Sequence, residues 1–467
     1  MNIEIPSINS NELLVNNYIE YSKYVADTRA YPDIVDGMKT SYRRCIHQIY
    51  KGCPRHMVKS SKAIGEVVVA HPHPSSIYGV LVQMTQPDGA FPVFDGQGNF
   101  GSKIPPSGPA AVRYTELMLS DLSIKLFESF SDSLEMVEGE MIVEPKRLAS
   151  YLPLSLLTGS SGIPVGLKRL NAPALNPVDL VDYAIELMKG NKNPNILVRP
   201  NIGNILVKTP KSEWKKLLEN GEGKCICAPN MVVDEQNRKI TVTGIPEEKD
   251  FTHLVSALQE EIDKDQIDVR DETTKEVCFV VEILPHKKVN IKDLAKKVDK
   301  ALTKTVTYKF IFCDNGYIIY CGIQATMLRC QEYLKECCKK STQTEIDEKQ
   351  KQLDVLEIIE LMKKDGSITK LSKMTKNQAI EYIVKTYETS ENIAKGVLSK
   401  PISYLTKEHD KEIKDLKSNI KELKNILKDV NKYLITQYEA LREEIKLKMK
   451  GRKMTKFSVS KKALLNS

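Results

Sequence analysis

Apolar residues recur at intervals of three and four along the first part of the chain, which predicts four amphipathic helices. The first covers residues 12–26 and can pack either on its own domain or on a partner. The next three cover residues 38–52, 61–68 and 75–84, separated by Gly and Pro residues. The expected inward positions are Leu13, Leu14, Tyr18, Tyr21 and Val25, then Met38, Tyr42, Ile46 and Ile49, then Ile64, Val67 and Val68, and last Ile77, Leu81 and Met84. Three short helices joined by tight turns, with Lys and Arg outward, predict a helix-turn-helix that binds DNA.

Short apolar runs rich in β-branched residues alternate with helical periodicity between about residues 150 and 325. This mixture predicts a domain built from strands and helices. Strands are expected at residues 204–208, 239–246, 277–284 and 308–312, and helices at 250–264 and 291–301.

From about Met327 the glycines nearly vanish, and two long helices are predicted at residues 327–364 and 407–448, around a compact helical segment at 368–401. The second long helix carries a heptad repeat made by Ile413, Leu416, Ile420, Leu423, Leu427, Val430 and Leu434. Such a repeat can pair with another chain or fold back on the first helix. The antiparallel fold-back is favoured because the intervening segment can turn the chain around.

The length of 467 residues suggests roughly two to four domains, each able to bury its own core. Hydrophobic residues make up 41% of the sequence, yet no stretch approaches the ~20 uninterrupted apolar residues of a membrane helix. The N-terminus lacks the pattern of a secretion signal, so we expect a soluble, cytoplasmic protein. Among ten cysteines only Cys225 with Cys227 and Cys337 with Cys338 lie close in sequence, which favours reduced, packed thiols over a zinc site.

The net charge is +8, but its distribution along the chain is uneven. Residues 37–73 hold seven Lys or Arg and a single carboxylate, Glu66, while residues 446–467 hold eight basic residues and no acid. The basic tail can equally be a solvated surface. The first group lies on predicted helices and predicts binding to the DNA backbone, with an affinity that falls steeply as salt rises.

The stretch from Asp95 to Glu116 combines a Gly-rich segment, 96–101, with three prolines and ends in Arg113 and Tyr114. A Gly-rich loop alone is weak support for phosphate binding, and this one does not follow a strand-to-helix nucleotide pattern. A tyrosine acts as a nucleophile only when cations, a base or a metal stabilise its phenolate. A long loop that ends in an Arg-Tyr pair close in sequence to a basic group is therefore a candidate reactive site.

Six motifs occur in order: YPDIVDGMK (31–39), Arg43-Arg44, KSSKAIGEV (59–67), HPH (71–73), FDGQGNFGS (94–102) and AAVRYTE (110–116). Together they closely resemble the breakage-reunion subunit of type IIA DNA topoisomerases, and the overall size best matches the medium subunit of the T-even-phage type of enzyme. The resemblance continues through GSSGIPVG (159–166) and IDVRDET (267–273) and covers roughly residues 12–445. Six ordered motifs are far more specific than any one of them.

This resemblance implies that Tyr114 attacks a DNA phosphodiester and becomes joined to the 5′ phosphate, while Arg113 stabilises the developing charge. Arg29, His71 and His73 would complete the catalytic site, with one histidine assisting proton transfer. Without these motifs, a single histidine is more often structural than catalytic, and an Arg-Tyr pair is more often part of the ordinary surface than of an active site. The expected DNA contacts are Lys39, Arg43, Arg44, Lys59, Lys62, Ser75, Ser76 and Ile163.

The sequence also departs from the family pattern. The family usually reads HPHGDSA, whereas residues 71–76 read HPHPSS and are one residue shorter on each side of the histidines, which leaves open which serine matches. Ile163 resembles the residue that family members wedge between base pairs to bend DNA, with a buried core position as the alternative. Pro164 stands where the family usually has alanine, and KIPPSGP (103–109) replaces a more acidic segment.

The resemblance further implies a multidomain α+β fold. Its parts would be an N-terminal arm helix (1–26), a winged-helix domain with the catalytic tyrosine (27–149), an α/β shoulder or tower (150–326), an antiparallel coiled-coil stalk (327–448) with a helical dimer gate at about 365–405, and a basic tail (449–467). Two chains would form a homodimer through the winged-helix domain and the stalk tip, around a hole for duplex DNA.

No P-loop occurs, and Asp263-x-Asp265 is more simply a solvated helix surface than a metal site. The resemblance therefore places Mg²⁺ and ATP on a partner subunit. Strand passage driven by ATP would relax, decatenate and unknot DNA, and without the β-rich domain by which gyrase wraps DNA we do not expect supercoiling. The alternatives are a non-enzymatic architectural DNA-binding dimer and a tyrosine enzyme of the nicking-closing or recombinase type that acts alone.

Overall fold

The computed structural model describes residues 10–457 except 54, 87–90, 104–105, 128, 248, 250, 273–279, 372–373, 402–403, 406 and 450–454. The chain divides into two compact units. One consists of Met1–Leu334 with Gln437–Ser467, and the other of Lys335–Thr436. Most of the expected basic tail, 449–467, lies outside the described residues.

The first described element is α1 (Ser10–Val25), which continues directly into the five-residue π-helix η1 (Ala26–Ala30). The sequence correctly predicts this helix. Its apolar stripe, however, is largely exposed: Leu14 and Tyr21 keep 69% and 54% of their surface, and Val25 is the stripe's buried member. Most of the stripe therefore does not pack on the chain's own domain.

Three helices then pack on a small antiparallel sheet. They are α2 (Thr40–Gly52), α3 (Ser60–Val68) and α4 (Pro74–Thr85), and the sheet has the order β1 (Val58–Lys59), β5 (Glu116–Leu119), β2 (Phe94–Gln97). The predicted inward residues Ile46, Ile49, Val67, Ile77 and Leu81 each expose 1% or less of their surface. The three helices are thus predicted correctly, as are most of their inward positions, while Tyr42, Ile64 and Val68 are only partly buried.

Short elements complete this part of the unit. They are β3 (Ser102–Lys103) paired with β4 (Pro106–Ser107), η2 (Val112–Tyr114), α5 (Asp121–Phe127), η3 (Ser131–Ser133), the hairpin of β6 (Met136–Glu138) and β7 (Val143–Pro145), and α6 (Leu154–Thr158).

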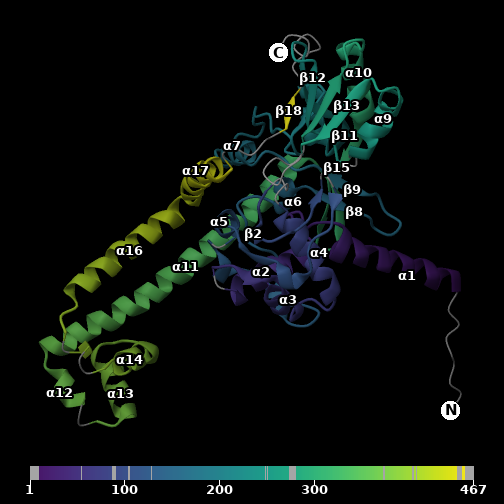
Figure 1. The fold of residues 1–467 in the computed structure, drawn as a ribbon. Coiled ribbons are helices and arrows are strands. Elements are labelled where there is room, and N and C mark those ends of the chain that lie inside the picture. The colour runs from purple at the N-terminus through teal and green to yellow at the C-terminus, as the bar shows by residue number, and fades with distance from the viewer. Residues whose placement is uncertain are drawn as a thin grey trace, which may run out of the picture. The chain divides into compact units, whose positions relative to one another are not determined.

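A nine-stranded sheet belongs to the same unit, with strand order β13-β14-β12-β11-β15-β9-β8 and with β10 pairing both β11 and β18. Figure 1 shows α9 (Phe251–Asp263) and α10 (Ile291–Leu302) together on strands of this sheet. Their apolar faces share one buried core with the sheet, which includes Ile240, Leu258 and Val298. The strands are β8 (Ser160–Gly162), β9 (Leu170–Ala172), β10 (Ile205–Val207), β11 (Glu222–Asp234), β12 (Lys239–Gly244), β13 (Ile267–Asp271), β14 (Val281–Pro285), β15 (Lys304–Lys309) and β18 (Lys456–Phe457).

Several elements of this region were not predicted from the sequence, among them α7 (Pro177–Met188), α8 (Lys211–Asn220) and β11. β11 is 13 residues long and shows no simple alternation of buried and exposed positions. The reason is that its first half pairs with β15 and its second half with β12, with a shift of register between Asn230 and Met231.

The strand expected at 308–312 is in fact two strands in different sheets. β15 ends at Lys309, and β16 (Ile311–Asp314) forms a separate hairpin with β17 (Tyr317–Tyr320). Between them the buried Phe310 donates its backbone N–H to the Gly221 carbonyl at 2.8 Å. This bond holds the chain where it leaves the large sheet.

The unit Lys335–Thr436 is helical in its described residues. It holds most of α11 (Ile323–Lys364), then α12 (Ser367–Leu371), α13 (Lys376–Thr386), α14 (Glu391–Leu398), α16 (Asp410–Lys428) and the start of α17 (Val430–Lys448). Lys417 Nζ on α16 lies 2.7 Å from Glu357 Oε1 on α11. Tyr433 follows Lys417 in the chain, whereas Cys338 and Glu345, which raise the pKa of Tyr433, precede Glu357. The two helical runs are therefore antiparallel within this unit.

The predicted continuous helix at 407–448 is wrong at one point. α16 ends at Lys428, Asp429 leaves the helical conformation with φ −142° and ψ 74°, and α17 begins at Val430. The Asp429 side chain accepts the backbone N–H of Lys432 at 2.9 Å, which caps the new helix.

Among the described helices, none combines the length and apolar character that a membrane crossing requires. None of the nine cysteines within the described residues forms a disulfide, and seven of them are buried.

Candidate catalytic tyrosine site

Tyr114 lies at the end of the short 3₁₀ turn η2, and one residue separates it from β5. Its backbone N–H donates to the Ala111 carbonyl at 2.9 Å, and 62% of its surface is exposed. The guanidinium carbon of Arg113 lies 4.6 Å from the centre of the Tyr114 ring. The phenol is therefore presented to solvent with a cation against its ring.

Thr115, the next residue, fixes the backbone of this turn. It is fully buried, and its hydroxyl lies 2.7 Å from Ser60 Oγ and 3.1 Å from the Tyr78 hydroxyl. The Ser60 backbone N–H donates to the Thr115 carbonyl at 3.0 Å, and Tyr78 donates to the Ala110 carbonyl at 2.6 Å. An exposed tyrosine is thus carried on a backbone held from α3 and α4.

The Gly-rich segment packs against the same turn. Gly98 has φ +101°, and a Cβ atom there would lie 2.6 Å from the Tyr114 carbonyl oxygen. The Asn99 side chain accepts the Gly101 N–H at 2.8 Å, and the Asn99 carbonyl accepts the Ala110 N–H at 2.8 Å. These contacts account for the glycine at position 98 through close packing on the tyrosine turn.

His71 and His73 lie just before α4 and contact each other, with ring centroids 6.0 Å apart and the planes nearly perpendicular. His71 Nε2 lies 3.1 Å from Ser76 Oγ, and Ser76 Oγ donates to the His73 carbonyl at 2.8 Å. Ser75 and the His73 ring are exposed. Of the two serines left open by the sequence, Ser76 contacts the histidines.

Arg43 and Arg44, which were expected to face outward, point into the protein. Arg43 Nε donates to Asp36 Oδ2 at 2.7 Å, and its side chain is only 12% exposed. Arg44 Nε and Nη2 each donate to a Glu144 oxygen at 2.8 Å, and its side chain is 5% exposed. Arginine can be buried where carboxylates pair with it, and Asp36 and Glu144 do so here. The outward orientation predicted for both arginines is wrong.

Lys39 is also engaged within the chain. It is half-buried, and its Nζ donates to the Ser161 carbonyl at 2.6 Å, at the start of the turn that carries Ile163. Burial lowers the pKa of Lys39. Ile163 itself is 77% exposed, which excludes the buried-core alternative for this residue.

The remaining expected DNA contacts lie on the surface. Lys62 is exposed on α3, and Arg29 is exposed near the end of η1. Lys59 is exposed as well, and its Nζ lies 2.6 Å from Glu116 Oε1. An exposed ion pair of this kind is weak and can exchange for a phosphate.

The predicted residues therefore form separate contact groups. His71, His73, Ser76 and Arg44 touch one another, and Tyr114 touches Arg113. Within the described part of the chain, no hydrogen bond, ion pair or ring contact joins Tyr114 to the histidines.

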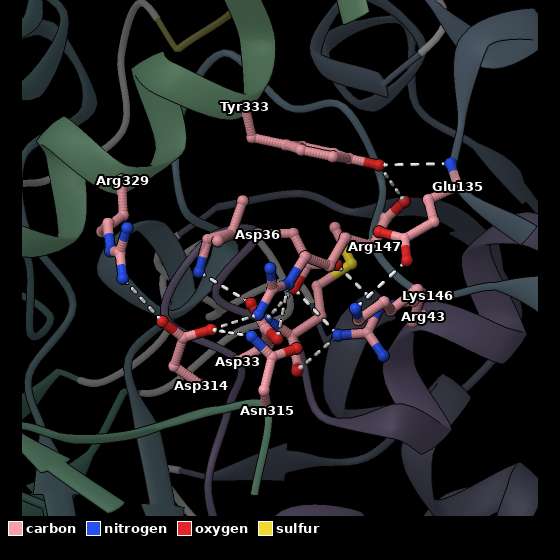
Figure 2. A network of polar contacts seen from close by, with 12 residues as sticks. Asp33, Asp36, Arg43, Glu135, Lys146, Arg147, Asp314, Asn315, Arg329 and Tyr333 are labelled. Carbon is pink, nitrogen blue, oxygen red and sulfur yellow. Dashed lines mark hydrogen bonds and ion pairs between the residues drawn. The ribbon is translucent and has the colours of Figure 1, made fainter. Parts of the chain in front are cut away.

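A polar network around Asp33 and Asp314 was not predicted from the sequence (Figure 2). Arg147 donates to Asp33 Oδ2 at 2.9 Å and to Asp314 Oδ1 at 2.5 Å, and Asp314 also accepts from Arg329 at 2.9 Å. Burial and the neighbouring Asp36 raise the pKa of Asp33 to about 6. The sequence signal that could have indicated this network is the pair of carboxylates, Asp33 and Asp36, in the otherwise apolar segment 31–38. The partner of Asp33, Arg147, is distant along the chain and could not be inferred.

No group of three or more His, Cys, Asp or Glu side chains among the described residues is placed to hold a metal ion. Near Tyr114, the Glu116 carboxylate forms an ion pair with Lys59.

The family of DNA gyrase/topoisomerase IV A subunits matches residues 29–441. The DNA gyrase A subunit of Thermotoga maritima is 29% identical over 450 residues, which covers 89% of this chain and 54% of that protein. The DNA gyrase A subunit of Staphylococcus aureus strain N315 is 28% identical, covering 91% and 52%. The A subunit of DNA topoisomerase 4 from Staphylococcus aureus strain NCTC 8325 is 28% identical, covering 97% and 60%. The chain spans about half the length of the curated relatives it matches.

Proposed function

Because the chain belongs to the family of DNA gyrase and topoisomerase IV A subunits, we propose that it is the DNA-cleaving and rejoining subunit of a type IIA DNA topoisomerase. The observation that carries this proposal is Tyr114: it lies within the AAVRYTE motif (110–116), it is 62% exposed, and its turn is held by hydrogen bonds of Ser60 and Tyr78.

The proposed chemistry is a reversible transesterification. The Tyr114 hydroxyl oxygen attacks the phosphorus of a DNA phosphodiester, and its proton is lost. The bond from phosphorus to the 3′ oxygen breaks, the 3′ oxygen leaves and takes up a proton, and the 5′ phosphate stays joined to tyrosine. Attack by the 3′ hydroxyl reverses the step and reseals the strand. One phosphoester replaces another, so no external energy is needed for rejoining.

Charge around the tyrosine supports this role. Arg113 stacks on the Tyr114 ring and can turn toward a phosphate, and Arg29, Lys59 and Lys62 are exposed cations of the same unit. Electrostatic stabilisation of the developing phosphorane charge by such cations is a large part of phosphoryl-transfer catalysis. His73 and Ser75 are exposed and would add hydrogen bonds to the DNA backbone.

Ile163 supports DNA bending as part of this function. A large apolar side chain that is 77% exposed at the end of a strand can insert between base pairs and unstack them. Lys39 holds this turn through the Ser161 carbonyl, so we propose a positioning role for Lys39.

In line with the family resemblance, we place Mg²⁺ and ATP on a partner subunit. The described residues beside Tyr114 offer no set of carboxylates that fits the metal, and no step above runs through it. We also propose that two chains act as a homodimer so that two copies of Tyr114 cut both strands. In this proposal residues 27–149 form a winged-helix domain, and the antiparallel helices form a coiled-coil stalk with a dimer contact at 365–405.

The test is covalent trapping with Tyr114→Phe. The chain, its partner subunit, end-labelled duplex and Mg²⁺ are mixed, denatured and run on a gel that separates protein-linked DNA. Wild type should give a covalent adduct and Tyr114→Phe none. Tyr317→Phe is the matched control, because Tyr317 is 75% exposed on β17 and should leave the adduct unchanged.

The same gel, run beside a mobility-shift gel of the undenatured mixture that reports DNA binding, separates the alternatives. An adduct that persists in Tyr114→Phe would overturn the assignment of the nucleophile. DNA binding without any adduct from wild type would support the architectural dimer. An adduct formed without partner and metal would support a tyrosine enzyme that acts alone.

A further inference from the structure

Arg44 is clamped inside the protein by one carboxylate. Its Nε and Nη2 atoms donate to the two oxygens of Glu144, 2.8 Å each, and a longer contact of 3.5 Å joins Nη1 to Glu140. Glu144 belongs to β7, 100 residues along the chain from Arg44 on α2. Because only 5% of its side chain is exposed, Arg44 has almost no surface that a DNA phosphate could contact.

The same guanidinium sets the direction of hydrogen bonds at His71. Arg44 Nη1 lies 3.2 Å from His71 Nδ1, and a guanidinium can only donate, so Nδ1 accepts. The ring proton of the neutral imidazole must then lie on Nε2, which donates to Ser76 Oγ at 3.1 Å. Ser76 in turn donates to the His73 carbonyl at 2.8 Å.

We propose that Arg44, held by Glu144, is a positioning residue that fixes the tautomer of His71 and so shapes the turn before α4, and that Arg44 does not contact DNA. The proposal rests on the proposed function only where it concerns DNA. It revises the DNA-contact role expected for Arg44 from its motif.

The charges around His71 agree with this arrangement. Burial lowers the pKa of His71, as do Arg44 from α2, His73 and Arg29 from η1, while Glu140 between β6 and β7 opposes them. A neutral His71 keeps the Nδ1 lone pair for Arg44. Both ring nitrogens are then engaged, so His71 acts on the shape of the 71–76 turn through Ser76.

The first test measures DNA affinity against salt for the full chain. The logarithm of the binding constant falls with the logarithm of salt concentration, and the slope becomes shallower by about 0.9 for each phosphate that the protein no longer neutralises. Lys62→Gln should make the slope shallower by about 0.9 because Lys62 is an exposed cation on α3. Arg44→Gln should keep the wild-type slope, and a change equal to that of Lys62→Gln would overturn the proposal.

The second test needs no DNA and therefore stands if the proposed function fails. In the histidine-labelled chain, the ¹⁵N shifts of His71, assigned through His71→Gln, should show a protonated Nε2 and an accepting Nδ1. Arg44→Gln removes one of the cations that lower the pKa of His71, so the His71 titration should move to higher pH.

A second variant protects this test against misfolding. Arg44→Gln leaves Glu144 buried without its partner, whereas Arg44→Gln with Glu144→Gln replaces the ion pair with two neutral amides. This double variant should also raise the pH at which His71 titrates. Glu135→Gln is the matched control, since Glu135 pairs with Lys146 and should leave His71 unchanged. The proposal would be disproved if His71 Nδ1 were protonated in the wild type, or if His71 titrated at the same pH in the double variant as in the wild type.

Discussion

Replacing Gly98 with alanine tests whether the Gly-rich segment serves to hold the Tyr114 turn. A Cβ atom at this position would lie 2.6 Å from the Tyr114 carbonyl oxygen, whereas ordinary contacts begin at 3.4 Å. The turn or the loop must therefore move by roughly 0.8 Å, the difference between those two distances. Because the tyrosine hydroxyl is carried on this turn, the displacement reaches the proposed nucleophile.

Two costs add in the Gly98→Ala protein. A residue with a side chain is strained at the observed φ of +101°, by about 1–2 kcal/mol, and overpacking against backbone costs about 1–3 kcal/mol. We expect a loss of folding free energy of about 2–5 kcal/mol in total. Misplacing a reacting group by such a distance should lower the rate of DNA cleavage by about 10- to 100-fold.

The measurement is calorimetric unfolding together with covalent trapping on labelled DNA. Gly65→Ala is the matched control, because a Cβ atom at Gly65 meets nothing within 4 Å and Gly65 lies inside α3. That change should stabilise the helix by about 0.5–1 kcal/mol and leave cleavage intact. If Gly98→Ala is as stable and as active as Gly65→Ala, the packing argument for the Gly-rich segment is wrong.

Two further predictions follow from the exposure of Ile163 and the burial of His47. Ile163→Ala should reduce DNA bending, measured by energy transfer between dyes at the duplex ends, with stability unchanged within about 0.5 kcal/mol because the side chain is 77% exposed. Val232→Ala, at a position 55% exposed on β11, is its control, and unchanged bending by Ile163→Ala would argue against a wedge. Burial and Lys51 lower the pKa of His47 to about 4, so the unfolded chain binds more protons than the folded chain between that value and the ordinary pKa near ~6.5. The stability that His47 contributes is thus present above pH ~6.5 and is lost as the pH falls toward 4. On acidification, the melting temperature of His47→Gln should drop less than that of the wild type. An equal drop in both proteins would contradict this reasoning.

Periodicity predicted α2, α3 and α4 well because each of these helices buries one apolar stripe. The buried positions of α2, α3 and α4, such as Ile46, Val67 and Leu81, were identified from spacing alone. Strand β11 escaped prediction because its two halves pair with different strands. The break at Asp429 escaped because the heptad repeat continues through it, although aspartate is a common capping residue.

At the candidate site, the sequence supplied candidate residues but not the direction in which their side chains point. Arg43 and Arg44 look like surface cations because their carboxylate partners are decided by the tertiary fold, and Glu144 is 100 residues away from Arg44. The exposure of Ile163 could not be decided from the sequence either, since an apolar residue fits both a core and a wedge. Motif order identified Tyr114, and the fold added its anchors in Ser60 and Tyr78.

The contact between Gly162 and Ala30 has a consequence for how this sequence can evolve. A Cβ atom at Gly162 would lie 2.0 Å from the Ala30 carbonyl oxygen, which belongs to the backbone and would be present whatever residue stood at position 30. No compensating side-chain substitution at Ala30 can therefore relieve the clash. Homologous chains that keep η1 packed on this strand should retain glycine at this position even where the neighbouring Ile163 and Pro164 drift, so this glycine is a more reliable marker of the arrangement than the exposed residue beside it.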